Sequence, residues 1–169
     1  MKKLIPGTKH YYKDEKAFEA YKQMIEIGNG LTLSQICNIT KLGPHMIQNW
    51  VKRGYVSHPI KKKYFTRHLA RILLINALRE CMFIEDIGSL MVYINGDVDD
   101  ESDDIISEED LYKLFSSLIY EIEDINEVEK IIDKEVKNKK LNTCMKTMIY
   151  AYYAGELSKK SQAYLQKTK

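Results

Sequence analysis

Apolar residues recur at three- and four-residue spacing along most of this chain, and this spacing is the strongest constraint on its fold. The longest stripe of this kind runs from Leu111 to Val136. Only three prolines and eight glycines interrupt the 169 residues, which leaves room for long helices. No strand-rich region is evident outside the segment 55–65. The sequence therefore predicts an all-α fold with at most a short β wing.

The same spacing predicts where the helices lie. They are expected at 14–27, 32–39, 44–53, 66–81, 84–93 and 141–154, with one helix or two between 107 and 136. Thr66 and Ser107 are predicted N-caps, because their hydroxyls can accept a hydrogen bond from a free backbone N–H. If the segment 107–136 is broken, Asn126 is the predicted cap of its second helix.

Charged residues are sorted into two consecutive blocks. From Ile27 to Arg79 there are nine Lys or Arg residues and no acid, whereas from Glu80 to Asp110 there are twelve acids and no Lys or Arg. The formal net charge of the whole chain is only +2. Because binding responds to local charge, the positive block indicates an anionic partner.

The positive block also contains the pattern of a helix-turn-helix. Two short helical segments, 32–39 and 44–53, are joined by the turn 40–43, and Pro44 is favoured in the first position of a helix. In a helix-turn-helix the second helix enters the major groove of DNA, where its polar side chains meet the base edges. The pattern therefore predicts binding to double-stranded DNA.

The predicted DNA-binding residues form two groups. His45, Gln48 and Asn49 face outward near the start of the second helix, and Gln and Asn can pair bidentately with adenine. The second group would contact the phosphate backbone and comprises Lys52, Arg53, Lys61, Lys62, Lys63, Tyr64 and Arg67. Taken singly, such residues are usually only solvated, so the prediction depends on their combination.

Residues 33–93 resemble the DNA-binding domain of MerR-type bacterial regulators, which are winged helix-turn-helix proteins. The resemblance is clearest over 43–56, which reads Gly-Pro-His-Met-Ile-Gln-Asn-Trp-Val-Lys-Arg-Gly-Tyr-Val, and it continues over 33–40, 64–72 and 78–90. The chain is also similar to a bacterial family of MerR-like proteins with no assigned function. MerR-type helices usually carry Arg and Tyr where Gln48 and Asn49 lie, and their wing usually contains a glycine hairpin that is missing here.

The resemblance implies a MerR-like winged helix-turn-helix domain with a helical C-terminal extension. It also implies a homodimer, because MerR-type proteins dimerise through a long helix that follows the DNA-binding domain. The stripe from Leu111 to Val136 is the expected counterpart of that helix. The alternative for the same stripe is a helical bundle formed within one chain.

These observations divide the sequence into an N-terminal arm and helix at 1–30, a winged helix-turn-helix domain at 31–96, an acidic loop at 97–106 and a helical extension at 107–169. The acidic loop is expected to be a solvated linker. A second interpretation is that it masks the basic surface and weakens DNA binding until it is displaced.

The expected function is that of a bacterial transcriptional regulator that binds specific DNA sequences. The alternative is a protein-interaction module that keeps the fold without DNA binding and uses its Met- and Tyr-rich last helix to contact an unidentified partner. No catalytic set, glycine-rich phosphate loop or metal-ligand spacing is evident, so no enzyme activity, metal or cofactor is expected. Without an apolar leader or membrane-spanning run, the expected location is the cytoplasm.

Overall fold

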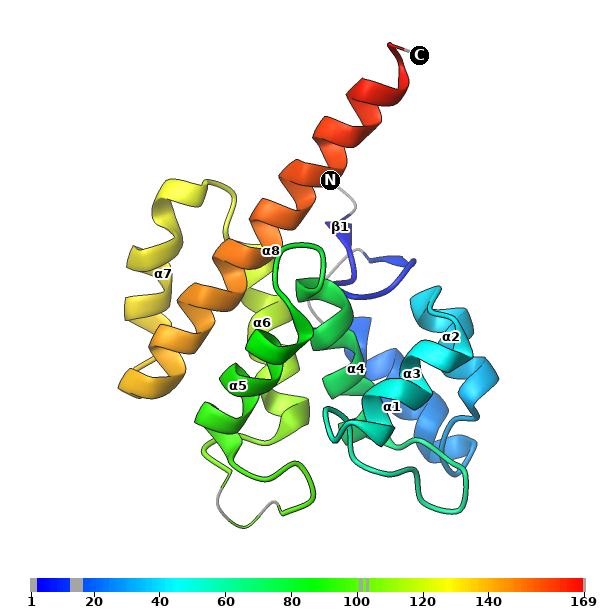
Figure 1. Cartoon of the computed structure of the whole chain (residues 1–169). Coiled ribbons are helices and arrows are strands. Elements are labelled where there is room, and N and C mark those ends of the chain that lie inside the picture. Colours follow the sequence, from blue (N-terminus) through cyan, green and yellow to red (C-terminus); the bar gives the residue numbers. More distant parts are fainter. Residues whose placement is uncertain (1–2, 13–16, 101, 103, 169) are drawn as a thin grey trace.

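The all-α prediction is confirmed by the computed structural model, which describes residues 3–12, 17–100, 102 and 104–168 (Figure 1). The described residues form α1 (Ala17–Ile27), α2 (Leu33–Thr40), α3 (Pro44–Lys52), α4 (Thr66–Leu78), α5 (Ile84–Asn95), α6 (Glu108–Glu121), the 3-10 helix η1 (Ile125–Glu127), α7 (Val128–Glu135) and α8 (Lys139–Gln166). The only sheet among them is an antiparallel pair of two-residue strands, β1 (Lys3–Leu4) and β2 (Tyr11–Tyr12).

Most helix ends lie within three residues of their predicted positions. The predicted start of the first helix, 14–16, lies outside the described residues. Thr66 is the first residue of α4 rather than its N-cap, and Phe65 holds the cap position. Ser107 is confirmed as the cap of α6, since its Oγ accepts a hydrogen bond from Asp110 N at 3.1 Å.

Helix α4 is the centre of the core. Ten of its side chains are buried, including a continuous run from His68 to Ile75. It packs most extensively against α6, and α1, α2, α5 and α8 also contact it. The core is therefore continuous across the predicted division of the sequence at residue 96.

The N-terminal arm packs across α4. Asn76 Nδ2 donates to Gly7 O at 2.7 Å, and Tyr112 Oη donates to Pro6 O at 2.7 Å. Gly7 has a left-handed backbone (φ +76°), and a Cβ at this position would lie 2.1 Å from Leu73 O. Only glycine allows so close an approach to the helix. The arm is thus fixed to both α4 and α6.

The apolar stripe from Leu111 to Val136 is buried within the same chain. Its helix is broken after Glu121, and the cap of η1 is Asp124, whose Oδ1 accepts from Asn126 N at 2.9 Å. The prediction that Asn126 is the cap was wrong, because Asp124 lies two residues earlier with its carboxylate over the free N–H. The expected dimer interface along this stripe was also wrong, because its apolar side chains pack against α4 and α8.

Helix α8 is much longer than predicted and continues to Gln166. Its buried positions end at Gly155, and Figure 1 shows its C-terminal part projecting away from the bundle. Leu157, Tyr164 and Leu165 on this projecting part are all more than half exposed. No helix in the described part of the chain has both the length and the apolar character of a membrane span.

Candidate nucleic-acid interface

The predicted helix-turn-helix corresponds to α2, the turn after it and α3, which are positioned by local capping and by the burial of one face of α3. At the start of α2, Thr32 Oγ1 accepts from Gln35 N at 3.3 Å and Gln35 Oε1 accepts from Thr32 N at 2.8 Å, which is a capping box. Lys41 closes α2 with a left-handed φ of 62°. Helix α3 then begins at Pro44 and turns its apolar side chains Ile47, Trp50 and Val51 into the core.

The burial of that face leaves a polar stripe on the outside of α3. His45, Gln48, Asn49 and Lys52 are all exposed. Their spacing of three, one and three residues places them on one side of the helix. The structure thus brings together the three predicted base-contacting residues and one predicted phosphate contact on a single surface.

The segment 55–65, which was predicted to form a wing, is a tight basic loop that contains no strand; it is called the wing below. Tyr64 forms an isolated bridge with Leu31, with both N–H···O distances at 2.8 Å. A second bridge joins Ile60 to Lys63, and the residues between them, Lys61 and Lys62, have left-handed φ values of 48° and 63°. The two lysines at the tip are exposed, and Lys63 is half-buried.

The prediction that Tyr64 contacts DNA was wrong. Only 4% of its surface is exposed, because its ring packs into the core beside Leu31 and His68. Tyr64 forms part of the inner wall of a groove of about 590 Å³ between α3 and the loop 55–65. Gln48 and Lys52 contribute from α3, and His58, Pro59 and Lys62 contribute from the loop. The helix surface and the wing therefore form one continuous basic face.

His68 fixes the wing to α4. Its Nδ1 accepts from Phe65 N at 2.9 Å, so Nε2 carries the proton and donates to His58 O at 3.0 Å. The side chain is 1% exposed, and burial lowers the pKa of His68 from its ordinary value of 6.5. A second ring proton would face the Phe65 N–H, so the neutral form is the one that holds the loop.

We expect the folded state to lose stability as the pH falls below about 6.5. His68 binds a proton more weakly in the folded than in the unfolded chain, so acid favours unfolding. The contribution of neutral His68 to stability is complete above the pKa that His68 has in the unfolded chain. It is lost as the pH falls through the lower pKa that His68 has in the folded chain. Urea unfolding between pH 7.5 and 5 measures this loss of stability. The variant His68→Gln should flatten this dependence, whereas His45→Gln, on the exposed face of α3, should leave it intact.

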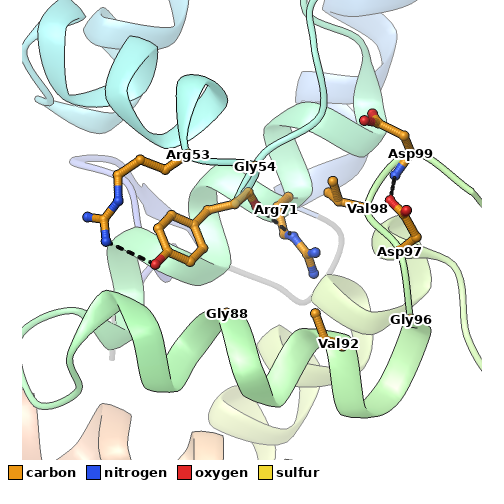
Figure 2. A pocket seen from close by; sticks show the side chains of 10 residues that line it. Arg53, Gly54, Arg71, Gly88, Val92, Gly96, Asp97, Val98 and Asp99 are labelled. Carbon is orange, nitrogen blue, oxygen red and sulfur yellow. Dashed lines mark hydrogen bonds between the residues drawn. The ribbon is translucent and has the colours of Figure 1, made fainter.

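Two of the predicted phosphate contacts are engaged within the chain. Arg53 Nη2 lies 2.6 Å from Glu85 Oε1 on α5. It also donates to Tyr55 Oη at 3.1 Å (Figure 2). Arg67 Nη2 donates to Val98 O at 3.2 Å in the acidic loop. These two arginines therefore connect the segment 44–67 to the acidic block, and their assignment as phosphate contacts stays a prediction.

A third arginine, which was not predicted as a site residue, is buried in the same region. Arg71 Nε donates to Tyr55 O at 3.0 Å, and Nη1 lies 2.9 Å from Glu108 Oε1. Burial lowers the pKa of Arg71 and raises the pKa of Glu108, while the attraction between the two charges opposes both shifts. The reversal of charge along the sequence was the available signal for these contacts, since blocks of opposite sign can also pair with each other.

Three lysines of the predicted interface differ from these arginines. Lys52, Lys61 and Lys62 are exposed and form no ion pair with any residue that the structure describes. The arginines of the positive block thus stabilise the fold, and these lysines supply the free positive charge of the basic face.

Comparison with known proteins assigns a family but no activity. A family model matches residues 18–115, and its description is "Domain of unknown function (DUF1836)". An uncharacterized protein of Bacillus subtilis (strain 168), YkrK, is 30% identical over 111 residues, which cover 61% of this chain and 45% of that protein. The chain therefore spans less than half the length of this relative. No solved structure matches the chain.

Proposed function

We propose that this chain, which belongs to the family described as a domain of unknown function (DUF1836), is a sequence-specific DNA-binding protein and a bacterial transcriptional regulator. On this proposal it has a MerR-like winged helix-turn-helix. Helix α3 enters the major groove, and the wing lies along the phosphate backbone.

The observation that carries the proposal is the exposed polar stripe of α3 beside the lysines of the wing. His45, Gln48 and Asn49 would meet base edges, and Lys52 lies next to them at the groove shared with the wing. No acid occurs between Ile27 and Arg79, so no carboxylate from this segment would repel DNA phosphates. Recognition of a DNA duplex requires polar side chains that contact the base edges and cationic side chains that contact the phosphates.

A second copy of the chain is part of the proposal, since helix-turn-helix proteins read two half-sites as dimers. The stripe of α6 and α7 is buried and cannot provide the interface. The projecting part of α8 exposes Leu157, Tyr164 and Leu165, and this surface is the proposed site of contact between the two copies.

The same projecting surface supports the alternative function, a protein-interaction module without DNA binding. Binding to mixed genomic DNA separates the two. DNA binding through phosphates weakens with salt, with a slope of about −0.9 in log K against log salt for each contact. Absence of salt-dependent binding at low ionic strength would favour the interaction module.

The variant Gln48→Ala/Asn49→Ala tests the base contacts. Each bidentate pair with a base contributes about 1–3 kcal/mol of discrimination, so the variant should lose preference for selected sites while it keeps its affinity for random duplex. Fluorescence anisotropy with both kinds of DNA measures this difference. The matched control is Gln23→Ala, which changes an exposed glutamine on α1. An equal loss on selected and random DNA would show that Gln48 and Asn49 do not read bases.

A further inference from the structure

The exposed face of α5 carries a groove with apolar walls. Its volume is about 600 Å³, and the residues that line it are Tyr55, Glu85, Gly88, Ser89, Val92 and Tyr93. Val92 and Tyr93 are each more than half exposed. Gly88 and Val92 lie on the side of α5 that faces the end of α3 (Figure 2). A Cβ at Gly88 would lie 2.5 Å from Tyr55 Cε1, so the glycine allows the Tyr55 ring to form a wall of this α5 groove.

The border of the α5 groove is acidic. The sequence contains no Lys or Arg over residues 80–110. Three aspartates on α5 and in the loop after it are exposed and form no ion pair with any residue that the structure describes: Asp86, Asp97 and Asp99. Two cations from other elements adjoin the groove. Arg53 is paired with Glu85, and Lys140 lies over the Tyr93 ring. The three aspartates therefore remain for a cationic partner.

The projecting part of α8, residues 157–168, has the complementary character and is called the α8 tail below. It contains three lysines and no acid. Its exposed apolar residues are Leu157, Tyr164 and Leu165, and spacings of seven and eight residues place them on one face of the helix. At about 1.5 Å of rise per residue, the helical part of the tail is about 15 Å long and α5 is about 18 Å long. The tail thus matches the groove in length, in apolar character and in charge.

The α8 tail lies beyond the groove of its own chain. Helices α5 and α8 run antiparallel, because Tyr93 near the end of α5 contacts Lys140 near the start of α8. A Cβ at Gly155 would lie 3.1 Å from Glu80 Cβ, just before the start of α5. Since α8 is continuous from Lys139 to Gln166, the residues after Gly155 extend past α5 (Figure 1). A tail that fills the groove must therefore come from another copy.

We infer that the α8 tail of one copy binds the α5 groove of a second copy. Its apolar face covers Val92 and Tyr93, and its lysines face the three aspartates. Each copy has one tail and one groove, so two copies related by a two-fold axis fill both. Two tails packed against each other would bring like charges together, and DNA phosphates would leave the apolar face of the tail uncovered. This pairing rests on the part of the proposed function that joins two copies, and it does not depend on DNA binding.

Sedimentation equilibrium of the full chain without DNA tests the inference, and the wild-type chain should form a dimer. The tail variant Lys160→Glu/Lys167→Glu and the groove variant Asp86→Lys/Asp99→Lys should each raise the dissociation constant by at least about tenfold, because charge reversal replaces attraction with repulsion. A mixture of the two variants should restore the dimer. In the mixed dimer the reversed tail meets the reversed groove, and the unchanged tail meets the unchanged groove.

The matched control is Glu26→Lys/Glu129→Lys, which makes the same change in net charge at exposed positions of α1 and α7 and should leave the dimer intact. Thermal unfolding verifies that all variants are folded. A dimer that the tail or the groove variant leaves unchanged, or a mixture that fails to associate, would overturn the inference alone. A monomeric wild-type chain would overturn it together with the proposed pairing of copies. Titration of DNA with the same samples tests DNA binding separately.

Discussion

Replacement of Glu108 by leucine is expected to lower the free energy of unfolding by about 3–5 kcal/mol, because it leaves a buried guanidinium without its counter-charge. Arg71 and Glu108 are 5% and 14% exposed, and their atoms approach to 2.9 Å. Urea denaturation at pH 7 measures the loss. The double variant Arg71→Met/Glu108→Leu should recover most of it, since a buried ion pair can be replaced by apolar residues of similar volume.

The pair between Arg53 and Glu85 provides the matched control. It is also an Arg–Glu bridge between the positive and the acidic block, but its side chains are 41% and 61% exposed. Exposed pairs contribute little to stability, so Glu85→Leu should change the unfolding midpoint far less than Glu108→Leu. If Glu108→Leu and Glu85→Leu lowered the free energy of unfolding equally, the burial of Arg71 would not be what makes its pair with Glu108 important for stability.

The second large effect is expected on DNA affinity. The variant Lys52→Ala/Lys61→Ala/Lys62→Ala removes three exposed lysines of the basic face. If each contacts one phosphate, the slope of log K against log salt should decrease in magnitude by about 2.7, and the affinity near 0.1 M salt should fall on the order of a hundredfold. Titration of random duplex at several salt concentrations measures both quantities.

The control for this variant is Lys130→Ala/Lys137→Ala/Lys139→Ala. These lysines are exposed around α7, on the side of the molecule away from α3 (Figure 1). The control has the same net charge as the test variant, so it reports the effect of total charge alone. If both variants bind DNA equally, the face formed by α3 and the wing is not the DNA-binding surface.

Sequence reasoning was most successful where the structure is decided locally. The turn between α2 and α3, the start of α3 at Pro44 and the cap at Ser107 all depend on residues within one turn of the helix end. The outward face of α3 followed from its apolar spacing. His45, Gln48 and Asn49 were therefore placed correctly on an exposed surface before any tertiary contact was known.

Long-range contacts were not predictable in the same way. The periodicity of the segment from Leu111 to Val136 shows that one face is buried, but it does not show whether the partner is α4 of the same chain or a second chain. The positive block likewise shows an excess of charge without showing which cations are already neutralised. Each of the three arginine contacts joins residues that are 31 to 37 positions apart in the sequence, beyond the reach of local patterns: Arg53 with Glu85, Arg67 with Val98 and Arg71 with Glu108.

During synthesis on the ribosome, Arg71 is made before its buried partner Glu108. The positive block is translated first, and at roughly 5–20 residues per second the codon for Glu108 follows that for Arg71 a few seconds later. At the start of this interval the nascent chain contains Arg53, Arg67 and Arg71 but none of the three residues that later contact them, Glu85, Val98 and Glu108. A transcript truncated in the acidic loop would therefore give a product with a strongly cationic module whose central arginine has lost its buried partner.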